Sequence, residues 1–381
     1  MSKKKVAIYT GSRSDYEILK PLILKLQNNY SIKLFVGPHH FQKKFGKTYN
    51  LIKKDKINPY YKCLTKLNYD EVDISKFICN SIFKYKRRLL KLNPDLVIIL
   101  GDRYEVLSFV LASFFLNIKI CHLHGGEITN GSFDDTIRHM ISKMSDYHFV
   151  TSKDYKKRLS LMGENPNNIF NFGSIGALNV KKTQRLPRSV IYKKLKIPAK
   201  SKIVTITFHP ETNSKIKFKD QIKIFLNSIK SNKKFFFIFT GCNADPYGNY
   251  FNTEIKKFVS KNKNSLFFKN LGGVDYFSLI NYSEFILGNS SSGIYEVPIL
   301  RKITINVGSR QSGRLLPKSI INCELNSLKI KKLLKKFYTY KKNIKFNNLF
   351  YKRDVLSKMT KQINKIINVE KKIKVFYEKK K

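Results

Sequence analysis

The chain has 381 residues, 42% of them hydrophobic, which is enough apolar material for two domains of ordinary size. The formal net charge of +48 comes mostly from lysine spread over the whole sequence, so we interpret it as charge on solvated faces and expect no nucleic-acid partner. No run of eighteen apolar residues predicts a spanning helix, and the basic residues 1–5 lead into a strand rather than a signal peptide. We therefore expect a cytoplasmic protein with no membrane partner.

The N-terminal half alternates short apolar runs with segments of helical spacing. Strands are predicted at residues 6–10, 31–37, 96–100, 118–122, 147–151 and 169–173. A long helix is predicted over residues 72–92, whereas residues 41–70 are too polar and aromatic for an assignment. This alternation predicts a doubly wound parallel sheet with helices on both faces.

A change of composition at residues 180–201, which are rich in lysine and arginine, predicts a linker, so we assign residues 1–179 to the first domain. A second series of strands follows at residues 203–208, 235–240, 265–268, 285–288 and 303–307, which predicts a second α/β domain over 180–350. Within residues 351–381 we expect a helix over 355–369 that packs back across the first domain, followed by a frayed tail.

Ionisable side chains gather where the predicted strands of the first half end, which is the edge at which open α/β sheets bind ligands. They are Arg13 after the first strand, Asp102 and Arg103 after residues 96–100, His122 as the last residue of the strand at 118–122, and His124, Glu127 and Asp134 after it. Two partly desolvated carboxylates held close together have separated pKa values, one suited to an acid and one to a base. This cluster therefore predicts acid/base chemistry.

The second half carries features suited to an anion at its own strand ends. They are His209 after residues 203–208, the loop with Ser290, Ser291 and Gly293 after residues 285–288, Glu296 in the helix beyond it, and Arg310 after residues 303–307. A hydroxyl-rich loop ahead of a helix offers N–H groups to a phosphate, with the helix dipole behind them. We therefore predict that this half binds a diphosphate.

Taken in order, these motifs resemble those of the hydrolysing UDP-N-acetylglucosamine 2-epimerases, most closely the bacterial branch that serves sialic and legionaminic acid synthesis. The resemblance covers roughly residues 5–325, with motifs at 11–16, 101–103, 122–127, 134–139, 209–210, 289–293 and 308–311. It implies two Rossmann-like domains, as in B-type glycosyltransferases (a GT-B-like fold), with the active site in the cleft between them. It also implies a homodimer.

The activity that the resemblance implies is elimination of UDP from a UDP-2-acetamido sugar to give a glycal, followed by addition of water with inversion at C2. The products are UDP and a free N-acetylmannosamine-type sugar, and no metal or nicotinamide cofactor is implied. By position, Asp102 and Asp134 match acid/base carboxylates and His209 matches a histidine at the diphosphate. The matches to nucleotide contacts are Arg13, Ser290, Ser291, Glu296 and Arg310.

One departure from the family concerns His124, because many members have glutamate at this position. The nearest carboxylate here is Glu127, three residues further on. Either Glu127 supplies the acid/base group, or His124 takes the role, or the substrate differs. The last alternative favours UDP-2,4-diacetamido-2,4,6-trideoxyglucose as a substrate.

Two other functions compete with the epimerase. A glycosyltransferase of the same architecture would pass the sugar of a UDP-sugar to an acceptor, but transfer needs fewer carboxylates than Asp102, Glu127 and Asp134 provide. A basic nucleic-acid-binding protein without catalysis would leave the clustering of ionisable residues at strand ends unexplained.

Overall fold

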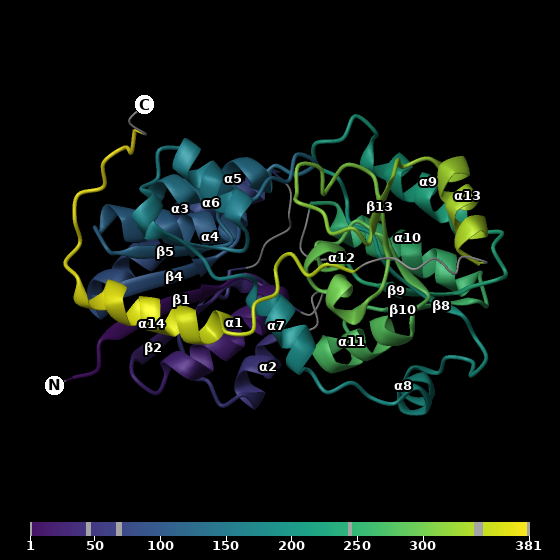
Figure 1. The fold of residues 1–381 in the computed structure, drawn as a ribbon, viewed down its shortest axis with the longest axis horizontal. Helices are drawn as coiled ribbons and strands as arrows, with labels where there is room; N and C mark the ends of the chain where they lie inside the picture. Colours follow the sequence, from purple (N-terminus) through teal and green to yellow (C-terminus); the bar gives the residue numbers. More distant parts are fainter. Residues whose placement is uncertain (1, 43–46, 66–70, 243–245, 339–345, 379–381) are drawn as a thin grey trace. The chain divides into compact units, whose positions relative to one another are not determined.

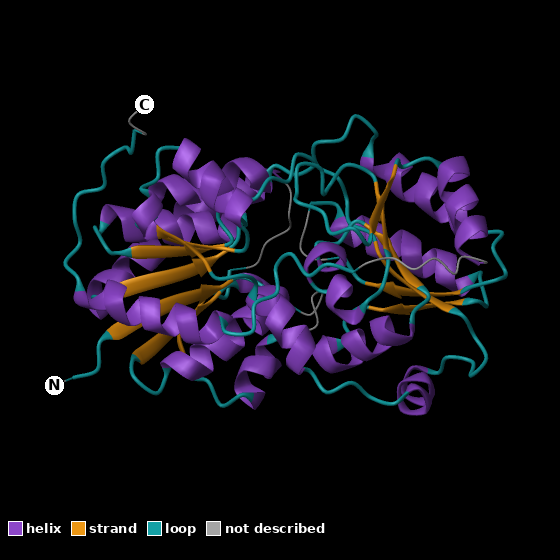
Figure 2. Cartoon of the chain, viewed as in Figure 1, coloured by secondary structure: helices purple, strands orange, loops and turns teal. Residues whose placement is uncertain are grey.

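The computed structural model describes residues 2–42, 47–65, 71–242, 246–338 and 346–378 (Figure 1). The chain divides into two compact units. The first unit comprises Met1–Glu127, Asp134–Asn179 and Phe350–Lys381, and the second comprises Ile128–Phe133 and Val180–Leu349. Each unit is a parallel sheet covered by helices on both faces (Figure 2), so the predicted fold class, two doubly wound parallel sheets, is confirmed.

The sheet of the first unit has seven parallel strands in the order β3-β2-β1-β4-β5-β6-β7. They are β1 (Lys5–Thr10), β2 (Ser31–Val36), β3 (Pro59–Lys62), β4 (Leu96–Leu100), β5 (Ile120–Leu123), β6 (Tyr147–Val150) and β7 (Ile169–Asn171). The order reverses between β1 and β4. Because ligands of open α/β sheets bind where the order reverses, we expect a binding site at the loops after these two strands.

The helices of the first unit cover both faces of its sheet. They are α1 (Arg13–Leu26), α2 (Tyr49–Lys54), α3 (Glu71–Leu92), α4 (Tyr104–Phe115), α5 (Asp134–Met144), α6 (Lys153–Leu161), α7 (Ile175–Lys182) and α14 (Val355–Asn368). One core joins the sheet to α1 and α14, and the other joins it to α3 and α4. Figure 1 shows α14, in yellow, beside α1, where Met359 and Ile363 are completely buried.

The second unit repeats this architecture with six parallel strands in the order β10-β9-β8-β11-β12-β13. The strands are β8 (Ile203–Thr207), β9 (Phe236–Thr240), β10 (Ser265–Phe268), β11 (Phe285–Gly288), β12 (Thr304–Val307) and β13 (Ile320–Cys323). Its helices are α8 (Arg188–Leu195), α9 (Phe218–Ile229), α10 (Gly248–Ser260), α11 (Gly272–Tyr282), α12 (Ser292–Tyr295) and α13 (Ser327–Tyr338). Here the order reverses between β8 and β11.

Two parts of the chain differ from the sequence-based expectation. Residues 371–377, expected to be frayed, contact the first unit: Lys371 Nζ donates to the carbonyl of Ile118 at 3.0 Å, and the N–H of Tyr377 donates to the carbonyl of Gly163 at 2.9 Å. Ile128–Phe133, which lies within the expected first domain, belongs to the second unit. Over the described ranges, no helix is long and apolar enough to cross a membrane.

Candidate functional site

Arg138 of α5 is the centre of the polar cluster in the first unit. Its side chain is only 2% exposed, and its guanidinium forms an ion pair with Asp102, which follows β4. The same guanidinium donates to Asp135 Oδ1 at 3.2 Å and to the backbone carbonyl of Glu127 at 3.0 Å. Asp134 is the first residue of α5. One buried cation thus joins the β4 loop, the β5 loop and the start of α5.

The β5 loop places His124 and Glu127 in direct contact. His124 Nδ1 lies 3.0 Å from Glu127 Oε1, and the Glu127 side chain is 3% exposed. His124 has φ +67, a left-handed conformation that residues other than glycine adopt rarely. The two residues that are alternatives for the missing family glutamate therefore form one hydrogen-bonded pair.

Two glycines make this loop shape feasible. A Cβ on Gly125 would lie 3.0 Å from both His122 Nδ1 and Ser142 Oγ, so a side chain would push these groups apart. Gly126 has φ +74, and a Cβ there would lie 2.6 Å from the carbonyl oxygen of Tyr155. The Gly-Gly sequence before Glu127 therefore lets the loop pack tightly against α5 and α6.

Arg103, predicted to bind substrate, has a buried carboxylate as its partner. Its guanidinium donates to both oxygens of Glu105, from Nε at 3.2 Å and from Nη2 at 3.1 Å. Glu105 is completely buried and its Oε1 also lies 2.8 Å from His39 Nδ1. Sequence reasoning missed Glu105 and His39, although His39 follows β2 and therefore lies at the same edge of the sheet.

Arg13 is the first residue of α1, directly after β1. Ser12 caps this helix: its N–H donates to Asp15 Oδ2 at 2.9 Å, and the N–H of Asp15 donates to the Ser12 hydroxyl at 3.4 Å. Burial raises the pKa of Asp15 to about 6, and the nearby Arg103 opposes that shift. The capping box fixes the start of α1 and with it the position of the Arg13 backbone.

In the second unit, Asn289 joins the loops after β8 and β11. Its side-chain oxygen accepts from the N–H of His209 at 2.7 Å, and its side-chain nitrogen donates to the His209 carbonyl at 2.9 Å. Arg310 Nη1 donates to the Asn289 carbonyl at 3.3 Å. Asn289 is the first residue of the motif at 289–293, and it brings together two of the predicted diphosphate residues.

The serine loop differs from the expectation in one respect. The helix behind it, α12, is a single turn followed by a 3₁₀ turn at Val297–Leu300, because Pro298 cannot continue an α-helix at this point. A helix dipole therefore adds little here, and Ser290 and Ser291 are left with hydroxyls and backbone N–H groups. Glu296, expected early in a longer helix, ends α12 and accepts from the Ser292 hydroxyl at 2.5 Å.

Gly293 and Arg310, both predicted to bind the nucleotide, lie in tightly packed parts of the second unit: Gly293 packs on a side chain and Arg310 on the backbone of a glycine. A Cβ on Gly293 would lie 2.7 Å from Thr304 Cγ2 of β12, and a Cβ on Gly131 would lie 2.4 Å from Arg310 Cα. Gly131 belongs to Ile128–Phe133, the segment between Glu127 and Asp134 that is part of the second unit. In the same loop, the Ser309 hydroxyl donates to Glu211 Oε2 at 2.8 Å.

The structure thus forms two clusters, one in each unit. Asp102 and Glu127 meet at Arg138 in the first, and His209 and Arg310 meet at Asn289 in the second. Within the part of the chain that the structure describes, no group of His, Cys, Asp and Glu side chains is arranged to hold a metal ion. The first cluster offers carboxylates for proton transfer, and the second offers donors for an anion.

The chain is similar to known proteins over most of its length. A family model described as UDP-N-acetylglucosamine 2-epimerase matches residues 23–364. The chain is 36% identical over 332 residues, 86% of its own length and 86% of the relative's, to the Campylobacter jejuni protein named GDP/UDP-N,N'-diacetylbacillosamine 2-epimerase (hydrolyzing). It is 35% identical over 326 residues, 84% of this chain and 82% of the relative, to polysialic acid biosynthesis protein P7 of Escherichia coli.

A solved structure has the same fold. The UDP-GlcNAc 2-epimerase of Methanocaldococcus jannaschii, solved in complex with UDP-GlcNAc and UDP, has a TM-score of 0.80 and 19% identity, covering 95% of this chain and 99% of that one. At this identity the structural likeness shows the fold alone, whereas the family model and the two relatives match the chain in sequence. The chain belongs to the UDP-N-acetylglucosamine 2-epimerase family.

Proposed function

We propose that the chain is a hydrolysing 2-epimerase that acts on a UDP-2-acetamido sugar. A base removes the C2 proton, the C1–O bond to the diphosphate breaks, and UDP leaves behind a glycal with a C1=C2 double bond. Water then adds its hydroxyl to C1, and C2 receives a proton on the face opposite to the one that lost its proton. This inversion at C2 releases an N-acetylmannosamine-type sugar. The observation that carries the proposal is the convergence of Asp102 and the Glu127 loop on Arg138, in a chain whose family is the 2-epimerases.

The proposal assigns proton transfer to the first unit. Asp102, Glu127 and Asp134 are the candidate acid/base groups, with His124 hydrogen-bonded to Glu127. A carboxylate that removes or returns the C2 proton contributes on the order of 10²–10⁴-fold to the rate. Arg138 holds Asp102 in one orientation relative to the Glu127 loop, which the two successive proton transfers require.

The second unit, in this proposal, holds the UDP moiety. Expulsion of UDP leaves negative charge on the diphosphate, so fixed donors at that position lower the barrier. Arg310, His209 and the Ser290, Ser291 and Gly293 loop are proposed to supply such donors, and Glu296 is proposed to accept from ribose hydroxyls. Arg13 and Arg103 of the first unit are proposed as further anion contacts, with Arg103 also tied to Glu105.

For the sugar we propose a 2,4-diacetamido-2,4,6-trideoxy derivative, with UDP-N-acetylglucosamine as the simpler alternative. Two observations support this assignment. One relative, 36% identical, carries diacetylbacillosamine in its name. The other is His124, which occupies a position where many family members have glutamate and therefore changes the surroundings of the substrate.

The test is incubation of the enzyme with UDP-N-acetylglucosamine, and separately with its 4-acetamido-6-deoxy analogue, in heavy water. We expect UDP release without any acceptor and deuterium at C2 of the freed sugar. Release of UDP without label at C2 would refute the elimination step. Turnover that requires an acceptor would instead establish a glycosyltransferase, and the faster of the two substrates identifies the sugar.

The proposal also includes a cytoplasmic homodimer without a nucleic-acid partner. Light scattering after size exclusion measures the mass directly, and a single-chain mass would contradict the dimer. Binding of RNA at physiological salt with a steep dependence on salt concentration would contradict the absence of a nucleic-acid partner.

A further inference from the structure

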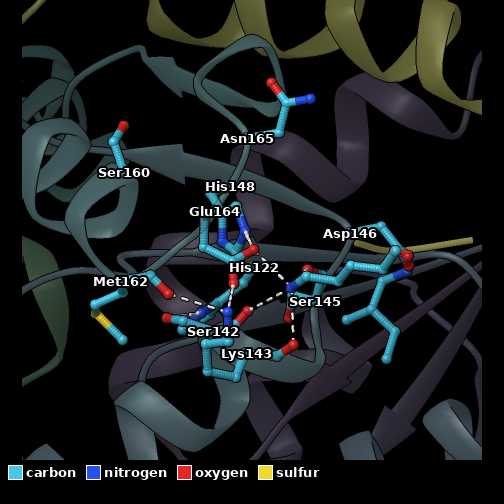
Figure 3. Close-up of polar contacts among 12 residues, drawn as sticks. His122, Ser142, Lys143, Ser145, Asp146, His148, Ser160, Met162, Glu164 and Asn165 are labelled. Carbon is cyan, nitrogen blue, oxygen red and sulfur yellow. Dashed lines mark hydrogen bonds and ion pairs between the residues drawn. The ribbon is translucent and has the colours of Figure 1, made fainter. Parts of the chain in front are cut away.

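His122 is a completely buried histidine at the end of β5 whose two ring nitrogens both have partners. Nε2 lies 2.8 Å from the carbonyl oxygen of Gly101, and Nδ1 lies 3.1 Å from the hydroxyl of Ser142. A carbonyl can only accept, so the proton of the neutral ring is on Nε2, and Nδ1 accepts from Ser142. Figure 3 shows His122 and Ser142 together within a larger network of polar side chains.

The imidazole of His122 stays neutral at any working pH. Burial lowers its pKa to about 3, although the bond to the Gly101 carbonyl opposes that shift. A group that neither gains nor loses a proton near neutral pH is a poor acid or base for catalysis. Its contribution must therefore come from the positions of its partners.

Those partners belong to the three segments that carry the candidate acid/base groups. Gly101 is the residue before Asp102. Ser142 lies one helical turn beyond Arg138 in α5, on the same face of the helix. Gly125, in the loop with Glu127, packs so closely on the ring that a Cβ would lie 3.0 Å from Nδ1.

We propose that His122 is a positioning residue that holds the Asp102 loop, the Glu127 loop and α5 in register. This inference rests on the proposed function, because it concerns the geometry needed for the two proton transfers. The contacts of His122 on which the inference depends are those with Gly101, Gly125 and Ser142. Misplacing a catalytic group by about 1 Å can cost on the order of 10²-fold in rate.

The test compares substitutions that remove one bond or both. In His122→Gln the side-chain amide can still donate to the Gly101 carbonyl, in His122→Asn it can still meet Ser142, and in His122→Leu neither bond remains. We expect kcat per folded enzyme to fall by roughly 10²-fold in His122→Leu, with KM and the Kd for UDP within about twofold of wild type. His122→Gln should recover at least tenfold of this loss.

The fate of the glycal is a second readout. A change in protein stability alone would not alter it. Asp102 and Glu127 are assigned to one reaction but lie in separate loops, so loss of register should uncouple elimination from hydration. We expect the share of released UDP that is accompanied by free glycal, rather than by the epimerised sugar, to rise in His122→Leu. The pH dependence of kcat should keep its shape, because the residue removed does not titrate in the working range.

Two serines of the same segment provide a matched pair if His122→Leu does not fold. Ser142→Ala removes the donor to His122, whereas Ser145→Ala removes a buried hydroxyl that donates to the Ile141 carbonyl at 2.8 Å. We expect Ser142→Ala to lower kcat about tenfold and Ser145→Ala to leave it unchanged. Equal kcat values for these two variants, or wild-type kcat in His122→Leu, overturn the inference.

The wild-type enzyme separates this inference from the proposed function. A wild type that releases no UDP from either sugar nucleotide overturns the proposed function, and the positioning role with it. A wild type that releases UDP and labels C2, alongside His122 variants with unchanged kcat and no free glycal, overturns the positioning role alone.

Discussion

His124 and Glu127 face each other across the β5 loop, with Nδ1 of the imidazole 3.0 Å from Oε1 of the carboxylate. The left-handed backbone of His124, at φ +67, is what allows the two side chains to meet within three residues. Such a conformation costs about 1–3 kcal/mol at a residue other than glycine. The pair therefore persists because the surrounding packing fixes it.

Glu127 is expected to be the member of this pair that transfers the proton. It is the more deeply buried of the two, and Arg138 binds its backbone carbonyl. We expect Glu127→Gln to lower kcat by about 10²–10⁴-fold, because the amide cannot exchange a proton. Asparagine tolerates a left-handed backbone, so His124→Asn should keep the shape of the loop and lower kcat by about tenfold. Steady-state kinetics that show the larger loss for His124→Asn would assign the acid/base role to His124 instead.

Asp102 and Asp135 allow a matched comparison, because both are carboxylates that bind the guanidinium of Arg138. We expect Asp102→Asn to abolish turnover while UDP binding, measured by calorimetry, stays within about threefold of wild type. Asp135→Asn removes a charge from the same guanidinium at a side chain that is equally exposed, 21% for each aspartate. It should retain at least a tenth of the wild-type kcat, since Asp135 is not among the proposed acid/base groups. If Asp102→Asn remains active, the choice of Asp102 as a base is wrong.

Arg310 is expected to bind the diphosphate rather than the nucleoside. Charge-assisted hydrogen bonds contribute about 1.5–3 kcal/mol, so Arg310→Met should raise the Kd for UDP by roughly ten- to hundredfold. The affinity for uridine should change by less than about threefold. Lys329→Met is the control, because it removes a positive charge from an exposed ion pair with Glu324 in the same unit. Equal losses for UDP and uridine would show that the substitution perturbs the whole loop.

The interior of each sheet and one of its two edges can be predicted from sequence, but the opposite edge cannot: β7 and β10 are edge strands that match the predictions at 169–173 and 265–268. A strand buried on both faces is a continuous apolar run, so residues 96–100 and 285–288 were assigned with the bounds that β4 and β11 have. The edge strands β3 and β13 are four residues each and partly exposed, and β3 begins at Pro59. Short polar segments of this kind form strands only because a neighbouring strand is present.

The candidate site shows the same division. Its strand-end residues can be predicted from the order of strands and loops, which identifies Asp102, Glu127 and His209 as candidates. Their partners do not, because Arg138 is 36 residues from Asp102 and Asn289 is 80 residues from His209. A pattern in the sequence cannot distinguish an arginine that faces solvent from one that is buried against three acceptors. The transfer of Ile128–Phe133 to the second unit is likewise a tertiary contact without a local signal.

The C-terminal tail, expected to be frayed, contributes a cation to a buried network in the first unit. Lys374 Nζ lies 2.6 Å from Glu164 Oε2. The same oxygen accepts from His148 Nε2 at 2.9 Å, and Figure 3 shows Glu164 and His148 side by side. The same ammonium donates to the backbone carbonyls of Lys143 at 2.7 Å and Ser145 at 2.6 Å, at the C-terminal end of α5. A cation at this end suits both the unpaired carbonyls and the helix dipole.

Removing Lys374 should therefore destabilise the first unit. We expect Lys374→Met to lower the free energy of unfolding by about 1–3 kcal/mol, because it leaves the buried carboxylate of Glu164 with fewer partners. Lys372→Met, at an exposed position of the same tail, should change it by less than about 0.5 kcal/mol. Urea unfolding measures both values. A frayed tail would instead make the two variants indistinguishable.

Glu164 should make the stability of the protein depend on pH in the acid range. Burial alone would raise its pKa, but His148 and the ammonium of Lys374 lower it to about 2. A carboxyl whose pKa is lower in the folded state stabilises the fold above its ordinary pKa, and this contribution is lost as pH falls from about 5 towards 2. The full effect of such a shift is about 3 kcal/mol, which solvent around the partly exposed lysines reduces to roughly 1–2 kcal/mol. The difference in unfolding free energy between wild type and Glu164→Gln should accordingly narrow between pH 5 and pH 3. A difference that stays constant over this range would contradict an ionised Glu164 in the folded protein.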